Sequence, residues 1–126
     1  MSLAELEAVF VRYIPRPPTD EERVLNPQWP TDHVVDCFQI EGVSAADAHG
    51  LLFVCPKSKT EGKDHYIQVY FAGSPVPDRL GKNKKGETVR WTASWLTGLN
   101  DLSLSPSIQE ENECGWHGHV TLGSAT

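Results

Sequence analysis

Near the C-terminus, the stretch NECGWHGHV at residues 112–120 holds Cys114 and His117 with two residues between them. Zinc prefers thiolate and imidazole ligands, usually four, and a Cys-x-x-His pair can supply two of them from one tight turn. Such a pair arises easily by chance among three cysteines and five histidines. Two ligands do not hold zinc, so the motif predicts a metal site only if a second half-site exists elsewhere.

Cys55 and His65 are the candidates for that second half-site. Cys55 follows an apolar run and precedes a proline, where the chain turns, and His65 begins the next run typical of a strand. A hairpin brings the end of one strand beside the start of the next, so these two residues can meet. The predicted ligand set is Cys55, His65, Cys114 and His117. In the plainer interpretation, Cys55 is a small buried hydrophobe and His65 a solvated strand end.

His119 opens an alternative with catalytic chemistry. Residues two apart on a strand share a face, so His117 and His119 could both reach one ion. A catalytic zinc keeps three protein ligands and a water, with a carboxylate nearby as general base. Glu110, Glu111 and Glu113 lie just upstream, although no HExxH helix fixes one of them against the metal. A solvated acidic loop is the simpler interpretation of these three residues.

The central strands are predicted most clearly. GLLFVCP at 50–56 is almost wholly apolar, as expected of a strand buried on both faces. HYIQVYF at 65–71 alternates, with Ile67 and Val69 on one face and Gln68 on the other. Separated by a glycine-containing loop, the two segments predict a β-hairpin.

The rest of the chain predicts short elements joined by turns. Ser2 and Glu5 have the spacing of a helix capping box before a strand that begins at Val9. The segment 15–32 carries five prolines in eighteen residues, which predicts an extended loop that wraps the domain, with Trp29 as its anchor. Further along the chain, the sequence predicts a strand at 33–40 and a helical turn at 44–49. It also predicts three short β segments, at 88–95, 102–108 and 116–122. With no repeat and no boundary, the chain predicts one β-rich α+β domain over residues 1–126, with short antiparallel strands, long Pro/Gly loops and a few helical turns.

Composition excludes several functions. The net charge of −6 does not suit a protein that binds phosphate backbones, so we expect no direct nucleic-acid binding and a protein partner instead. No apolar run approaches the ~20 residues of a membrane span, and the first residues lack the pattern of a secretory signal. Three cysteines are an awkward number for a disulfide framework, so a reducing cytoplasm with free or metal-bound thiols is the simplest expectation.

Nearly the whole chain resembles a family of small phage and prophage proteins catalogued only as a domain of unknown function. The most specific parts of the resemblance are CGWHG and LSPS. It is carried by LEAVF at 6–10, AHGLLFVCPKS at 48–58, DHYIQVYF at 64–71, RWTASWLTGLNDLSLSPSI at 90–108 and CGWHGHVTLG at 114–123. The resemblance implies a zinc-binding fold in the cytoplasm of a bacterial host, and it implies no activity.

Two positions depart from the family pattern. Ser58 stands where relatives carry the second cysteine of a Cys-Pro-x-Cys knuckle, and His119 follows CGWHG where relatives have an aromatic or aliphatic residue. His49 or His119 could therefore replace His65 as a ligand. The leading hypothesis is a zinc-stapled structural or protein-interaction module. The alternatives are a small zinc-dependent hydrolase with an open metal site, and an acidic decoy that inhibits a nucleic-acid-binding host protein.

Overall fold

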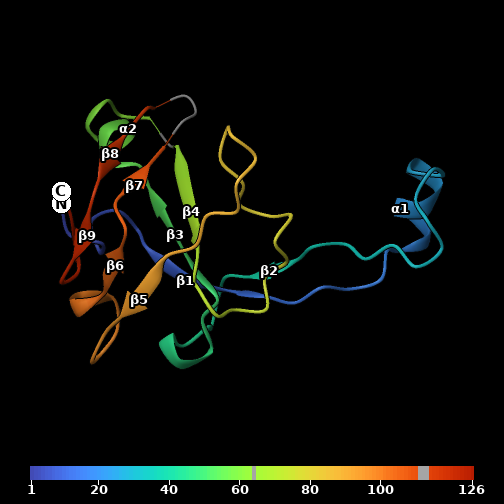
Figure 1. The fold of residues 1–126 in the computed structure, drawn as a ribbon, viewed down its shortest axis with the longest axis horizontal. Coiled ribbons are helices and arrows are strands. Elements are labelled where there is room, and N and C mark those ends of the chain that lie inside the picture. Colours follow the sequence, from blue (N-terminus) through green and yellow to red (C-terminus); the bar gives the residue numbers. More distant parts are fainter. Residues whose placement is uncertain (64, 111–113) are drawn as a thin grey trace.

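The computed structural model describes residues 1–63, 65–110 and 114–126 and is built around a four-stranded antiparallel sheet. The strands lie in the order β2-β1-β3-β4, so β2 and β4 are the outer strands (Figure 1). Their bounds are β1 Val9–Tyr13, β2 Phe38–Gln39, β3 Gly50–Val54 and β4 Tyr66–Tyr70. β3 is buried along nearly its whole length, as its apolar sequence predicts.

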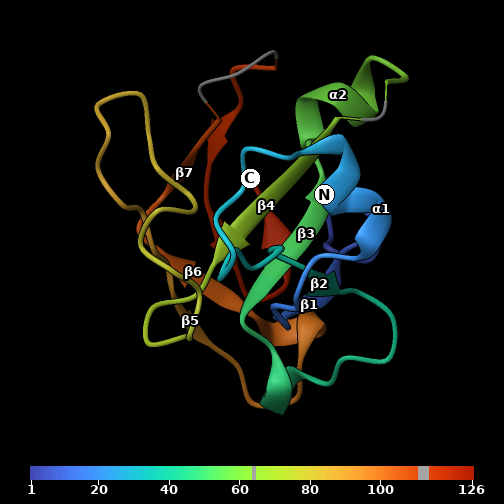
Figure 2. The ribbon, with the colours of Figure 1, turned by 90° about the vertical axis from the view of Figure 1, so that its right-hand side faces the viewer.

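Three pairs of short antiparallel strands form the C-terminal half of the chain: β5 with β6, β7 with β8 and β9 with β10. Their bounds are β5 Thr92–Ser94, β6 Ser103–Ser105, β7 Ile108–Gln109, β8 His117–Gly118, β9 Val120–Thr121 and β10 Ser124–Ala125. These pairs pack beside one face of the sheet (Figures 1 and 2). The architecture is the predicted β-rich α+β arrangement with short antiparallel strands.

The core lies between the sheet and these short pairs. Alternation on β4 sends Ile67 and Val69 inward, where they join Leu51 and Phe53 of β3. Residues of the C-terminal half complete the same cluster: Leu102, Leu104, Ile108 and Val120. One continuous core therefore joins the two halves of the chain.

Short helices punctuate the loops: α1 Asp20–Leu25, α2 Pro56–Thr60, and the 3-10 turns η1 Ala45–Asp47 and η2 Leu99–Asp101. The predicted capping box at the N-terminus is confirmed, because the Glu5 amide donates to the Ser2 hydroxyl at 3.1 Å. α2 begins directly after β3, with Pro56 at its first turn, where a proline costs no hydrogen bond. It occupies part of the predicted loop of the β3–β4 hairpin.

Residues 14–37 form an arm that projects away from the body (Figures 1 and 2). Its two sides continue the β1–β2 pairing through a bridge between Arg16 and Val35. The sequence prediction of a loop wrapping the domain, anchored by Trp29, was wrong. Trp29 stacks on His33 within the arm at 4.2 Å between ring centroids, so it does not reach the core.

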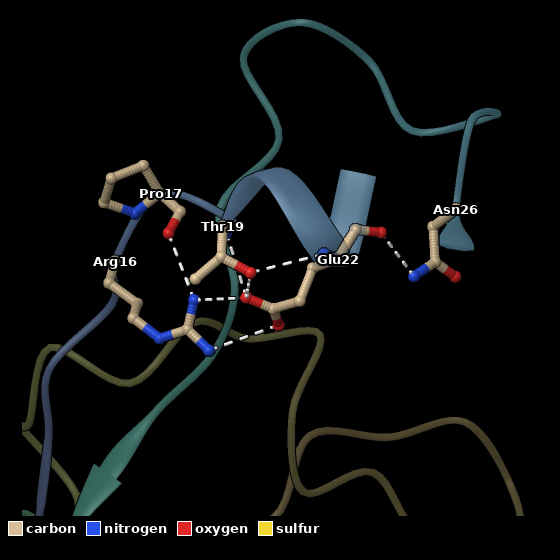
Figure 3. Close-up of polar contacts among 5 residues, drawn as sticks. All are labelled: Arg16, Pro17, Thr19, Glu22 and Asn26. Atoms are coloured by element: carbon tan, nitrogen blue, oxygen red, sulfur yellow. Dashed lines mark hydrogen bonds and ion pairs between the residues drawn. The ribbon is translucent and has the colours of Figure 1, made fainter. Parts of the chain in front are cut away.

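Helix α1 at the tip of the arm is held by local polar contacts (Figure 3). Thr19 and Glu22 form a complete capping box, which satisfies two amides that the first turn leaves open. Arg16 donates to the Glu22 carboxylate at 2.7 Å. This contact and the bond from Thr19 lower the pKa of Glu22 to about 2. The prolines around α1 suggested a featureless loop, but its own sequence, TDEERVL, carries a helix start.

Candidate functional site

Cys55 and Cys114, both predicted ligands, lie in contact. Their Sγ atoms are 2.8 Å apart across 59 residues of chain. Cys55 is fully buried at the end of β3, and Cys114 is half-buried before β8 and packs against the core. The contact joins the central hairpin to the C-terminal strands.

Backbone hydrogen bonds hold the chain near each of the two cysteines. The Cys55 amide donates to the His65 carbonyl at 2.7 Å, which confirms that the hairpin brings these residues together. On the other side, the Glu110 amide donates to the Trp116 carbonyl at 2.7 Å and closes the turn that carries Cys114. Trp116 then packs edge-on against Phe53 of β3, with 6.1 Å between ring centroids.

The side chain of His65 faces Glu110. Its Nε2 is 3.6 Å from the Glu110 carboxylate, which is too long for a hydrogen bond. Within the described part of the chain this buried nitrogen has no hydrogen-bond partner. Ser58 is also buried, and its hydroxyl accepts from the His65 amide at 3.0 Å. Ser58 thus closes the end of the hairpin by a hydrogen bond.

The other histidines take different positions. His117 is exposed on β8, and its Nε2 is 3.1 Å from the Ser107 hydroxyl. His119 lies on the same side as His117, with 6.5 Å between ring centroids. His49 precedes β3, at the opposite end from Cys55, and its Nδ1 accepts from the Tyr13 amide at 3.0 Å.

Zinc does not fit the two sulfurs as they are placed. An ion at the usual distance of about 2.3 Å from both would be held at an S–Zn–S angle of about 75°, far from the tetrahedral ~109°. Among residues 1–63, 65–110 and 114–126, no three His, Cys, Asp or Glu side chains are grouped as a metal site. The four-ligand set stays a prediction, which elemental analysis of untagged protein purified without chelator tests.

The surroundings of Cys114 favour its thiol form. Burial and then the contact with Cys55 raise the pKa of Cys114 to about 11, against a smaller opposing effect of the Trp116 amide. Thiols, unlike thiolates, are poor nucleophiles and poor metal ligands. Of the three candidate general bases only Glu110 can be placed, because Glu111 and Glu113 lie outside the described residues. The open-site hydrolase therefore also stays a prediction.

The outer edge of β4 is a second candidate site, which the sequence did not reveal. Phe71 donates its amide to the His49 carbonyl at 2.8 Å, and the Cys55 amide donates to His65. The odd-numbered residues of this strand therefore form the ladder with β3. Because bonding direction alternates along a strand, the even-numbered residues turn their N–H and C=O groups away from β3.

Three residues of β4 carry these outward groups. The carbonyl of Tyr70 is used, since it accepts from the Trp91 amide at 3.0 Å. The backbone groups of Tyr66 and Gln68 have no partner on that edge within the described residues. Unpaired strand edges are templates for a further strand.

A hollow of about 440 Å³ lies along this edge. Residues 67–70 of β4 form one wall, residues 107–110 with β7 form the facing wall, and Val89 and Trp91 line it with residues 81–84 of a loop. The lining mixes apolar side chains with Lys82 and Glu110. Its shape and its exposed backbone groups suit an extended peptide.

No family model, curated protein or solved structure matches this chain. The resemblance to the phage family therefore rests on the quoted motifs alone and stays a prediction. In the described part of the chain, no helix has the length and hydropathy needed to cross a membrane. The function has to be inferred from the geometry of the two candidate sites.

Proposed function

We propose that this chain is a protein-interaction module whose β4 edge takes up an extended segment of a protein partner. The outward backbone groups of Gln68, which lines the hollow between β4 and β7, carry the proposal, and those of Tyr66 continue the same edge beyond the hollow. A peptide added here gains main-chain hydrogen bonds from the strand, and the hollow offers space for its side chains. This agrees with the protein partner expected from the acidic composition.

The arm supports the same proposal. Residues 14–37 bury no side chain, and the adjacent Val24 and Leu25 of α1 are 78% and 79% exposed. A helix that contributes nothing to the core and exposes apolar side chains suits an element that meets another molecule. Its first turn carries Asp20, Glu21 and Glu22, so a basic partner surface suits it, as in the decoy hypothesis.

Peptide selection tests the proposal without a known partner. Peptides selected from a random library against the full chain are titrated into isotope-labelled protein, and the amide shifts are mapped. We expect the largest shifts at Gln68 and Gln109, which line the hollow, and at Tyr66 on the same strand edge. Shifts confined to the arm would support the arm as the contact element and reject the β4 edge.

A matched pair of variants isolates the backbone contribution. Gln68→Pro removes the outward N–H and leaves the ladder with β3 intact, which is where an edge strand tolerates proline. Gln68→Ala keeps the N–H and removes the side chain. We expect proline to weaken peptide binding about tenfold, the worth of one hydrogen bond, and alanine to change it little. Equal effects of the two variants would contradict strand addition.

A further inference from the structure

The cysteine contact that does not suit zinc suits another chemistry. The sulfurs of Cys55 and Cys114, at 2.8 Å, are within about 0.8 Å of the S–S bond length of about 2.05 Å. A disulfide needs no third ligand, and none is grouped with them among the described residues. We infer that Cys55 and Cys114 are a modification site that closes reversibly into an intramolecular disulfide.

The third cysteine, Cys37, lies far from the other two. Cys37 lies at the base of the arm, where its carbonyl accepts from the Ile14 amide at 2.9 Å. β1 and β3 are antiparallel, with Val9 opposite Leu52 and Val11 opposite Gly50. The arm therefore leaves the sheet at the Gly50 end, whereas Cys55 lies beyond the other end of β3. Three cysteines cannot form a framework of several disulfides. Here two of them form one close pair, and the third is a remote thiol.

The difference in burial orders the reaction. Cys114 is the more accessible of the two, so its sulfur meets a small disulfide oxidant such as glutathione disulfide. The thiolate form of Cys114, a small fraction because its pKa is raised, bonds to one glutathione sulfur, and the other glutathione leaves as a thiol with the Cys114 proton, so this first step is slow. The buried Cys55 sulfur then attacks the Cys114 sulfur, and the second glutathione leaves with the Cys55 proton. In total the protein loses two electrons and two protons, and glutathione disulfide is reduced to two thiols.

The bond would fasten the end of β3 to Cys114, three residues before β8. β8 lies at the α2 end of the body, away from the arm (Figure 1). Oxidation therefore restrains the loop that joins the two cysteines, which are 59 positions apart in the sequence, and should stabilise the fold against heat. It leaves the arm and Cys37 untouched.

The test uses the reduced full chain, equilibrated in buffers of graded glutathione to glutathione-disulfide ratio. The samples are then quenched in acid and unfolded, free thiols are alkylated, and intact mass and peptide maps are recorded. We expect a species that carries one alkyl group, at Cys37, and apart from that group is lighter than the reduced chain by two hydrogens, with a linked peptide pair containing Cys55 and Cys114. Its melting temperature should exceed that of the reduced chain by several degrees.

Variants complete the test. Cys37→Ser should oxidise like the unchanged chain, whereas Cys114→Ser should form no internal disulfide. Because Cys114→Ser could fail to fold, the peptide map of the unchanged chain decides by itself. Three free thiols, counted after unfolding of protein equilibrated in the most oxidising buffer, or a disulfide through Cys37, would overturn the inference. So would stoichiometric zinc in the purified chain that Cys55 and Cys114 bind.

Discussion

At the scale of single residues, the immediate partner of a side chain decides its chemistry. His49 and His65 flank β3 and β4 and look alike in the sequence. Nδ1 of His49 accepts a backbone N–H, whereas Nε2 of His65 faces a carboxylate at 3.6 Å. A proton on Nδ1 of His49 would remove the hydrogen bond from the Tyr13 amide, so mild acid should weaken this contact.

We expect His49 to make the protein less stable in mild acid. Burial is the largest cause that lowers its pKa below the usual value, and the Arg12 charge adds to it. Since the unfolded chain then binds a proton more readily than the folded one, stability is lost as pH falls through about 6.5 toward the lower folded value. Urea unfolding at pH 7.5 and 5.5 measures the loss.

The control for that prediction is His119→Gln, because His119 is exposed. His49→Gln should remove part of the acid dependence, and His119→Gln should keep it. An unchanged pH dependence in the His49 variant would assign the effect to other groups.

At the scale of elements, some helices and strands are stabilised by their own local sequence and others by packing in the core. α1 has a full set of N-terminal capping contacts and buries no residue, whereas β3 has no local stabilisation of this kind and is buried throughout most of its length. Both elements form, for opposite reasons. One is held by its own side chains and the other by the core.

We expect Leu25→Ser on α1 to change the free energy of unfolding by less than about 0.5 kcal/mol, as is usual for exposed positions. Leu51→Ala in β3 should cost about 2–5 kcal/mol, because it leaves a cavity in the core. Leu51 is fully buried and Leu25 is 79% exposed. Chemical denaturation of both variants checks the contrast. A large loss for Leu25→Ser would show that the arm packs on the body in solution.

The turn CGWHG depends on a glycine for packing. A Cβ at Gly118 would collide with the Trp116 ring and with the carbonyl of Thr126. We expect Gly118→Ala to lower stability by about 1–3 kcal/mol, the usual cost of overpacking. His119→Ala, at an exposed neighbouring position, is the matched control and should be nearly neutral. Thermal melts of the two variants show whether Trp116 must lie over Gly118.

At the scale of the whole molecule, one core and one thiol contact join the two halves of the chain. The chain ends also lie side by side, where the Met1 ammonium donates to the Ala125 carbonyl at 3.0 Å. Distant segments are therefore held together by contacts that close long loops, and such closures carry the largest entropy cost. A covalent bond at any of them would act on the unfolded state more than on the folded one.

We expect the oxidised chain to be more stable than the reduced chain by about 4 kcal/mol, the chain-entropy value for a loop of this length. The loop follows from the separation of 59 residues between Cys55 and Cys114. Paired urea titrations, with and without reductant, measure the difference. In Cys37→Ser the same difference should persist, and a gain that disappears in that variant would trace it to another pair.

The sequence by itself determined the strands, their faces and the class of fold. Alternation of apolar residues placed Ile67 and Val69 on the buried face of β4. The apolar run at 50–54 predicted a strand buried on both faces. Both patterns can be recognised within a few consecutive residues. It also paired Cys55 with His65 across the hairpin. These predictions depend on residues near each other in the chain, and the structure agrees with each of them.

Tertiary structure alone decided which surfaces stay open. Nothing in the composition of β4 marks it as an outer strand, since that depends on which strand comes beside it. The prolines of residues 14–37 did not predict that this segment projects as an arm. A β-ribbon that leaves the body and a loop that wraps it have the same turn residues. The distance of 2.8 Å between the two sulfurs is likewise set by packing between segments 59 residues apart. Only this distance shows how closely the two thiols approach each other.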